Sequence, residues 1–163
     1  MHDSNTDTPQ SSPHGPGVRI HPPVIYAGSI LAGIGIDRVL PLQMPLGLHG
    51  PVYSGIILAL VLLLAGLCIY EFHKAGTDVR PDRPDSALIT SGPYCHSRNP
   101  LYLGLTLVQV AAAAWFNNAW VLAMTAVSVV VISRYAIRRE EQYLESLFGE
   151  SYLDYKQRVR RWL

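Results

Sequence analysis

The longest apolar stretch of the chain, residues 51–70, contains no charged side chain. A helix of that length covers roughly 30 Å, the hydrocarbon thickness of a bilayer, so the stretch predicts a transmembrane helix. Two further uncharged stretches, 101–116 and 119–133, are separated by Asn117 and Asn118. Because asparagine favours turns, they predict two antiparallel helices that turn at this pair.

A fourth apolar stretch, residues 23–36, precedes Asp37 and Arg38. Its length would also suit the hydrophobic region of a signal peptide. The polar segment 1–18 before it and the charged pair after it favour a membrane-embedded helix instead. Segment 1–18 itself is rich in Ser, Pro, Gly and Asp, which predicts a disordered tail.

These patterns predict an all-α fold, an integral membrane bundle of about four transmembrane helices in a single domain over residues 19–163. The expected segments are spans at 22–42, 51–73, 100–116 and 118–139, an irregular cytoplasmic loop at 74–99 and C-terminal surface helices at 140–163. In the last segment Tyr152, Tyr155 and Val159 fall on one side and basic residues on the other. This amphipathic pattern predicts a short helix that lies on the membrane surface.

Lysine and arginine are concentrated in the loop at 74–99 and after residue 133. By the positive-inside rule, both regions face the cytoplasm. An even number of spans then places the N-terminus and the C-terminus in the cytoplasm as well.

Composition narrows the class of protein further. Of the 163 residues, 49% are hydrophobic and only 15% are charged, against roughly 25% charged in soluble domains. This argues against a disordered chain and against a water-soluble globule. A net charge of +1 gives no basic field for nucleic acid, and the two cysteines lack zinc-ligand spacing, so no metal site is expected.

The loop at 74–99 leads into a helix that Pro100 can open, with Asn99 as its N-cap. The free N–H groups at such a helix start can bind a carboxylate, although a simple helix start explains the same residues equally well.

An acidic pair follows the last span. Arg134, Arg138 and Glu141 recur at i, i+4 and i+7 and would share one helical face, with Glu140 beside it. Arginines at a span edge are usually interface anchors, but acidic residues there often face the bundle interior or a ligand. A pocket with a carboxylate, one or two arginines, two tyrosines and a helix N-terminus suits a zwitterionic ligand that also carries an aromatic ring.

Two long motifs identify a family. The segments SALITSGPYCHSRNPLYLG and RREEQYLESLFGESYLDYKQRVRRWL resemble the isoprenylcysteine carboxyl methyltransferases and related phospholipid-methyltransferase-like membrane proteins. The resemblance covers about residues 22–163. Because the chain is shorter than the eukaryotic enzymes, it looks like a prokaryotic member in the inner membrane, for which a prenylated protein is a doubtful substrate.

The resemblance implies a membrane enzyme that uses S-adenosylmethionine. By motif position, the residues that would contact this cofactor are Ser86, Ala87, Leu88, Ile89, Tyr94, Asn99, Pro100, Leu101, Tyr102 and Glu140. The arginine that holds the acceptor would be Arg134 or, second, Arg138. Many relatives have histidine where this chain has Asn99, and because asparagine does not titrate, no general base is expected there.

The residue types suit this chemistry. Glu140 can pair with a cationic group of the cofactor, and Tyr94 and Tyr102 can pack on adenine or lie near the sulfonium. Methyl transfer to an anionic carboxylate or thiolate of a lipophilic small-molecule or prenylated acceptor needs alignment and exclusion of water, with no acid–base pair. The bilayer would supply such an acceptor, and the oligomeric state is open.

Two alternatives belong to other classes. Membrane sterol reductases have a similar G-x-Y…R-H-P-x-Y pattern and bind NADPH, for which Arg80 and Arg83 could hold the 2′-phosphate. A non-catalytic membrane protein that keeps the fold is the other. The EE…FG…Y ending favours the methyltransferase over both.

Overall fold

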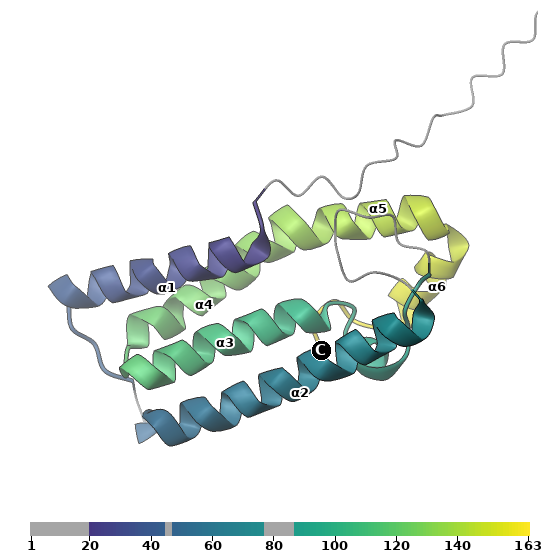
Figure 1. The fold of residues 1–163 in the computed structure, drawn as a ribbon. Helices are drawn as coiled ribbons and strands as arrows, with labels where there is room; N and C mark the ends of the chain where they lie inside the picture. The colour runs from purple at the N-terminus through teal and green to yellow at the C-terminus, as the bar shows by residue number, and fades with distance from the viewer. Residues whose placement is uncertain (1–19, 45–46, 77–86) are drawn as a thin grey trace, which may run out of the picture.

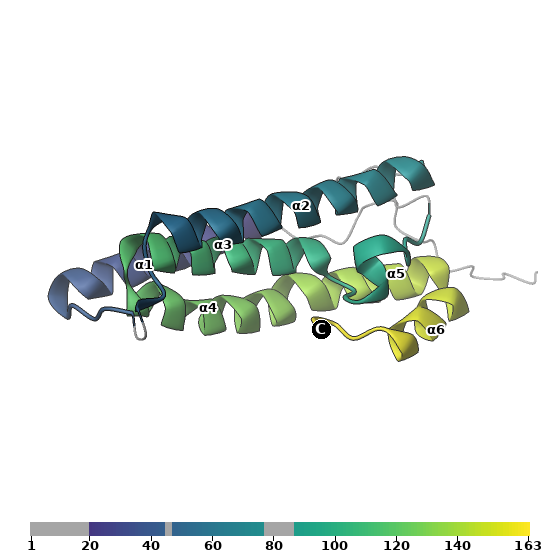
Figure 2. The same ribbon diagram turned by 90° about the horizontal axis from the view of Figure 1, so that it is seen from below.

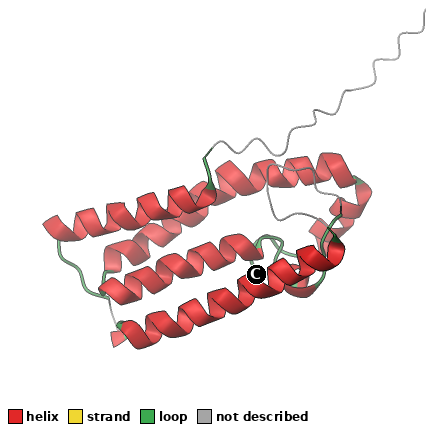
Figure 3. Cartoon of the chain, viewed as in Figure 1, coloured by secondary structure: helices red, strands yellow, loops and turns green. Residues whose placement is uncertain are grey.

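The computed structural model describes residues 20–44, 47–76 and 87–163, and these residues form helices and loops without a strand. Figure 3 shows this composition, which confirms the all-α prediction. The helices are α1 Pro22–Val39, α2 Pro51–Ala75, α3 Pro100–Phe116, α4 Ala119–Ile132, α5 Arg138–Phe148 and α6 Glu150–Arg158. The predicted tail at 1–18 lies outside the described residues.

Helices α1 to α4 run alongside one another (Figure 1). α2 packs on α3, α1 packs on α4, and α3 lies against α4. Helix α5 continues the line of α4, and α6 folds back beneath it, as Figure 2 shows. All the chemistry-bearing motifs therefore meet at one end of the bundle, where α2 ends and α3 begins.

Among the described residues, two helices are long and apolar enough to cross a bilayer, by length and composition: α2 and the continuous helix Ala119–Phe148. Helix α3 is apolar but has only 17 residues, and α1 is not among the two. Only 11% of the apolar window of α2 is buried, with Leu62 73% exposed and Leu63 61% exposed. Because such a face has no protein core to fill, hydrocarbon is the surrounding that suits it. The four-span count and the orientation stay predictions.

The turn between α3 and α4 confirms the predicted helical hairpin. Asn117 ends α3 in the left-handed conformation, with φ of 49°, which asparagine tolerates better than most residues. Asn118 then caps α4, because its Oδ1 accepts a hydrogen bond from the Val121 N–H at 3.0 Å.

Close backbone contact joins α1 to α4. A Cβ atom on Gly33 would lie 2.8 Å from the Cα of Val121, so only glycine permits this approach. Between α3 and α4, the Ser128 hydroxyl donates to Gln109 Oε1 at 2.8 Å, and both residues are fully buried. Small residues and isolated polar pairs thus hold the apolar part of the bundle together.

Candidate active site

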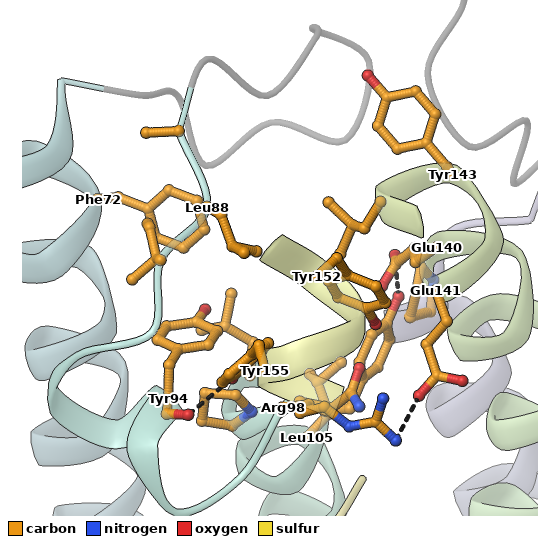
Figure 4. A pocket seen from close by; sticks show the side chains of 18 of the residues that line it. Phe72, Leu88, Tyr94, Arg98, Leu105, Glu140, Glu141, Tyr143, Tyr152 and Tyr155 are labelled. Carbon is orange, nitrogen blue, oxygen red and sulfur yellow. Dashed lines mark hydrogen bonds and ion pairs between the residues drawn. The ribbon is translucent and has the colours of Figure 1, made fainter. Parts of the chain in front are cut away.

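A cavity of about 290 Å³ opens where the end of α2, the start of α3 and the first part of α5 meet (Figure 4). Its wall combines α1, α2, α3, α5, α6 and the loop before α3. The lining residues are Pro22, Pro23, Phe72, Ala87, Leu88, Ile89, Tyr94, Arg98, Asn99, Pro100, Leu101, Tyr102, Leu105, Glu140, Glu141, Tyr143, Leu144, Tyr152 and Tyr155. Segments far apart in the sequence therefore build one concave site, the usual form of a small-molecule pocket.

Most of the residues that the family motif suggested for the cofactor lie in this wall. They are Ala87, Leu88, Ile89, Tyr94, Asn99, Pro100, Leu101, Tyr102 and Glu140. The tenth, Ser86, lies outside the described residues. The structure brings the nine together, and their contact with a cofactor stays a prediction.

Glu140 is positioned by a tyrosine of the facing helix. The Tyr102 hydroxyl donates to Glu140 Oε1 at 2.5 Å. A hydrogen bond to a carboxylate is short and strong when the donor is well placed. It fixes one oxygen of Glu140 at the cavity wall, on the side where α3 begins.

Glu141 has a different set of partners, although it is the next residue. It is only 6% exposed, and it accepts from Arg161 through Nε at 3.0 Å and Nη2 at 2.5 Å. Arg98 Nη2 lies 3.1 Å from Glu141 Oε1. One carboxylate thus holds two arginines, in a fork that matches guanidinium geometry.

The C-terminal tail fixes the loop residues around Arg98. The Arg98 N–H donates to the Arg160 carbonyl at 3.0 Å, and Asn99 Nδ2 donates to the Arg161 carbonyl at 3.0 Å. Pro100 opens α3 as predicted, but the Asn99 side chain makes no capping bond to the helix. The Asn99 amide bonds the C-terminal tail instead, so the first N–H groups of α3 have no side-chain cap from Asn99.

Buried and half-buried aromatic rings form much of the remaining wall. Phe72 and Tyr94 pack edge to face with centroids 5.9 Å apart, and the Tyr155 hydroxyl donates to the Tyr94 carbonyl at 2.7 Å. Burial raises the pKa of Tyr152 to about 12, with the Glu141 charge adding to the rise and the Arg98 charge opposing it. The phenol is therefore neutral at pH 7, and this wall offers π faces that attract a cation.

Arg134 and Arg138, predicted for the acceptor, do not line the cavity and are exposed. The prediction placed them on one face with Glu141, which is buried. For Arg134 the difference follows from a π-helical turn at Ser133–Ile137, because an i→i+5 turn holds one residue more than an α-helical turn and shifts the register between Arg134 and Glu141. Arg138 follows that turn in the same helix as Glu141, but its side chain lies on the exposed side. A role for the two arginines in acceptor binding stays a prediction.

Several wall residues were not proposed from the sequence. Arg98 falls inside the first motif segment but was given no role there. Tyr152 and Tyr155 were assigned to a membrane-surface helix, but they are 1% and 3% exposed and pack into the cavity wall. Their shared helical face was the available signal; it identified an apolar side, but the sequence did not show what that side would cover.

Comparison with known proteins gives a consistent result. A family model described as phospholipid methyltransferase matches residues 51–151. The chain is 31% identical over 107 residues to protein-S-isoprenylcysteine O-methyltransferase of Rattus norvegicus, which covers 61% of this chain and 38% of that protein. The same enzyme of Dictyostelium discoideum is 32% identical over 84 residues, covering 47% of this chain and 32% of the relative. An uncharacterized protein of Haemophilus influenzae is 44% identical over 63 residues, 39% of this chain and all of that protein.

Proposed function

The chain belongs to the phospholipid methyltransferase family, and we propose that it transfers a methyl group from S-adenosylmethionine to a lipophilic acceptor at the membrane. The chain spans 38% of the rat relative's length. We therefore assign the activity of that relative to this chain only as a proposal. An acceptor with a carboxylate or a thiolate suits the chemistry best.

The observation that carries the proposal is the pairing of an acidic group with aromatic rings in one cavity. Glu140 and the neutral tyrosines Tyr94, Tyr152 and Tyr155 line the same space. A carboxylate attracts an ammonium or sulfonium, and π faces attract either cation and pack on a purine. These groups fit a cationic cofactor that carries an aromatic base.

The residues would act by binding and orientation. S-adenosylmethionine supplies an activated methyl group on a positively charged sulfur. The acceptor oxygen or sulfur forms a bond to that methyl carbon while the carbon–sulfur bond breaks and its electron pair stays on sulfur. Since an anionic acceptor has no proton to lose, the wall needs to align the reactants and exclude water, which fits a wall that is mostly apolar.

The first test is calorimetric titration of the detergent-purified protein with S-adenosylhomocysteine, with NADPH in a parallel experiment. We expect micromolar binding of S-adenosylhomocysteine and none of NADPH. Glu140→Gln should weaken that binding by about 10- to 100-fold, the range for a hydrogen bond to a charged group.

The matched control is Glu145→Gln. Glu145 lies on the same helix and pairs with Lys156 at 3.0 Å, with both side chains more than one third exposed, and it does not line the cavity. Its variant should bind like the wild type. Binding of NADPH alone would move the protein to the reductases, and equal affinity of the Glu140 variant would remove Glu140 from the site.

A further inference from the structure

Arg98 has hydrogen-bonding capacity that the described residues do not use. Its side chain is 9% exposed, and within the described part of the chain its Nε and Nη1 atoms are buried without a hydrogen-bond partner. Its Nη2 contacts Glu141, and the Tyr152 hydroxyl also lies near the guanidinium. A buried guanidinium that leaves two donor nitrogens unpaired is costly, and such groups in folded proteins usually have a ligand, ion or water as partner.

The position of this arginine points to the cavity. Arg98 is one of the lining residues, and Figure 4 shows its guanidinium beside the cavity with the bond to Glu141 drawn from one terminal nitrogen. The C-terminal tail holds the Arg98 main chain and the neighbouring Asn99 side chain, through the carbonyls of Arg160 and Arg161. Together with the contact to Glu141, these bonds position the Arg98 side chain before any ligand arrives, which lowers the entropic cost of binding.

The local charge balance favours an anion. Arg98 and Arg161 carry two positive charges against the single negative charge of Glu141, so these three residues have an excess of one positive charge. The other acidic residue of the lining, Glu140, accepts a hydrogen bond from Tyr102 instead. Arg161 uses two nitrogens on Glu141 and is not part of the cavity lining. The excess charge is therefore available on Arg98, in a fork that suits the two oxygens of a carboxylate.

We propose that Arg98 is the carboxylate-binding residue of this cavity. The inference rests on the proposed function, in which two molecules carry a carboxylate, the amino-acid part of the cofactor and the acceptor. In either case Arg98 and Glu140 would bind opposite charges, and the arginine would act by positioning the bound molecule.

The experiment compares S-adenosylhomocysteine with its analogue in which hydrogen replaces the carboxylate, each titrated into the full-length protein. If the cofactor supplies the carboxylate, the wild type should bind S-adenosylhomocysteine about 10- to 100-fold more tightly than the analogue. In Arg98→Lys, which keeps a positive charge for Glu141 but loses the fork, that preference should fall to about twofold or less.

Arg161→Lys is the matched control, because it makes the same change on the other partner of Glu141, outside the cavity lining. It should keep the wild-type preference. If Arg98→Lys keeps the cofactor preference but raises the KM of a carboxylate acceptor and not that of a thiol acceptor, the acceptor supplies the carboxylate.

Other outcomes would count against the inference. An unchanged preference together with an unchanged acceptor KM would leave Arg98 as a partner of Glu141 only. If Arg98→Lys does not fold, the wild-type protein still tests the proposal. Equal affinity for S-adenosylhomocysteine and its analogue, together with equal KM for carboxylate and thiol acceptors, would overturn it. Failure of the wild type to bind S-adenosylhomocysteine at all would instead overturn the proposed function.

Discussion

The two ends of the helical bundle are held together in different ways. At one end, which we call the turn end, α1 meets the hairpin of α3 and α4 through Gly33 and the segment 117–121. Its contacts are close backbone packing and single hydrogen bonds. At the other, the cavity end, six segments meet around Glu140 and Glu141, and buried ion pairs link α5 to the loop and the C-terminal tail.

This contrast between the two ends indicates which contacts stabilise the fold and which prepare the protein to bind a ligand. Apolar packing at the turn end needs no ligand, because the contacts described there join groups of the protein itself. The cavity end buries charge, which is costly unless each group is paired. The free energy of unfolding should therefore depend strongly on single residues at the cavity end and on the molecule that the cavity binds.

The largest expected effect is at the cavity end. Glu141→Gln removes the shared counter-charge of Arg98 and Arg161, and breaking a buried pair from one side costs about 3 kcal/mol or more. We expect a loss close to about 3 kcal/mol rather than a larger one, because the Arg161 side chain is 38% exposed and water partly compensates for its lost partner. The measurement is the free energy of unfolding in detergent micelles, by denaturant titration.

Glu145→Gln is again the control, since its exposed pair with Lys156 should contribute less than about 1 kcal/mol. Equal losses in the two variants would show that Glu141 is no more important for stability than a surface residue, and the contrast between buried and exposed charge would fail.

At the turn end we expect a smaller effect from Gly33→Val. Its side chain would begin 2.8 Å from the Val121 backbone, so α1 and α4 must separate, at a cost of about 2 kcal/mol. Gly35→Val is the control, because a Cβ there meets nothing within 4 Å. Thermal unfolding should show the loss in the first variant only, and the folded protein should bind S-adenosylhomocysteine as the wild type does. A matching loss in both variants would contradict the close contact.

The turn end was largely predictable from the sequence and the cavity end only in part. An uncharged stretch and an asparagine pair predict helices and a turn, because both depend on local propensity and length. The pairing of Glu141 with Arg98 and Arg161 joins residues far apart in the chain, and no periodicity encodes it. The π-helical turn at Ser133–Ile137 also changes the register that a regular helical projection gives, which is why the projection placed Arg134 on one face with Glu141.

The identity of the cavity residues came from motif resemblance, and their arrangement required the fold. Tyr152 illustrates the point, because an amphipathic pattern does not distinguish a face that covers lipid from one that covers protein. Asn99 illustrates it again: its amide bonds the C-terminal tail at 3.0 Å, a contact between residues 62 positions apart that a helix-capping rule does not foresee.

The expected effect that is smallest at neutral pH is the alkaline titration of a tyrosine at the cavity end. Burial raises the pKa of Tyr152 from its ordinary 10.0 to about 12, so between these values the unfolded state releases a proton that the folded state keeps. The free energy of unfolding should therefore fall as pH rises through this window, by up to about 1.4 kcal/mol per pH unit from this residue. Tyr152→Phe removes the titrating group, and its stability should decline less steeply above pH 10 while running parallel to the wild type below pH 9. Denaturant titrations across this range measure the slopes, and parallel curves throughout would show that the Tyr152 phenol is not held in a buried site.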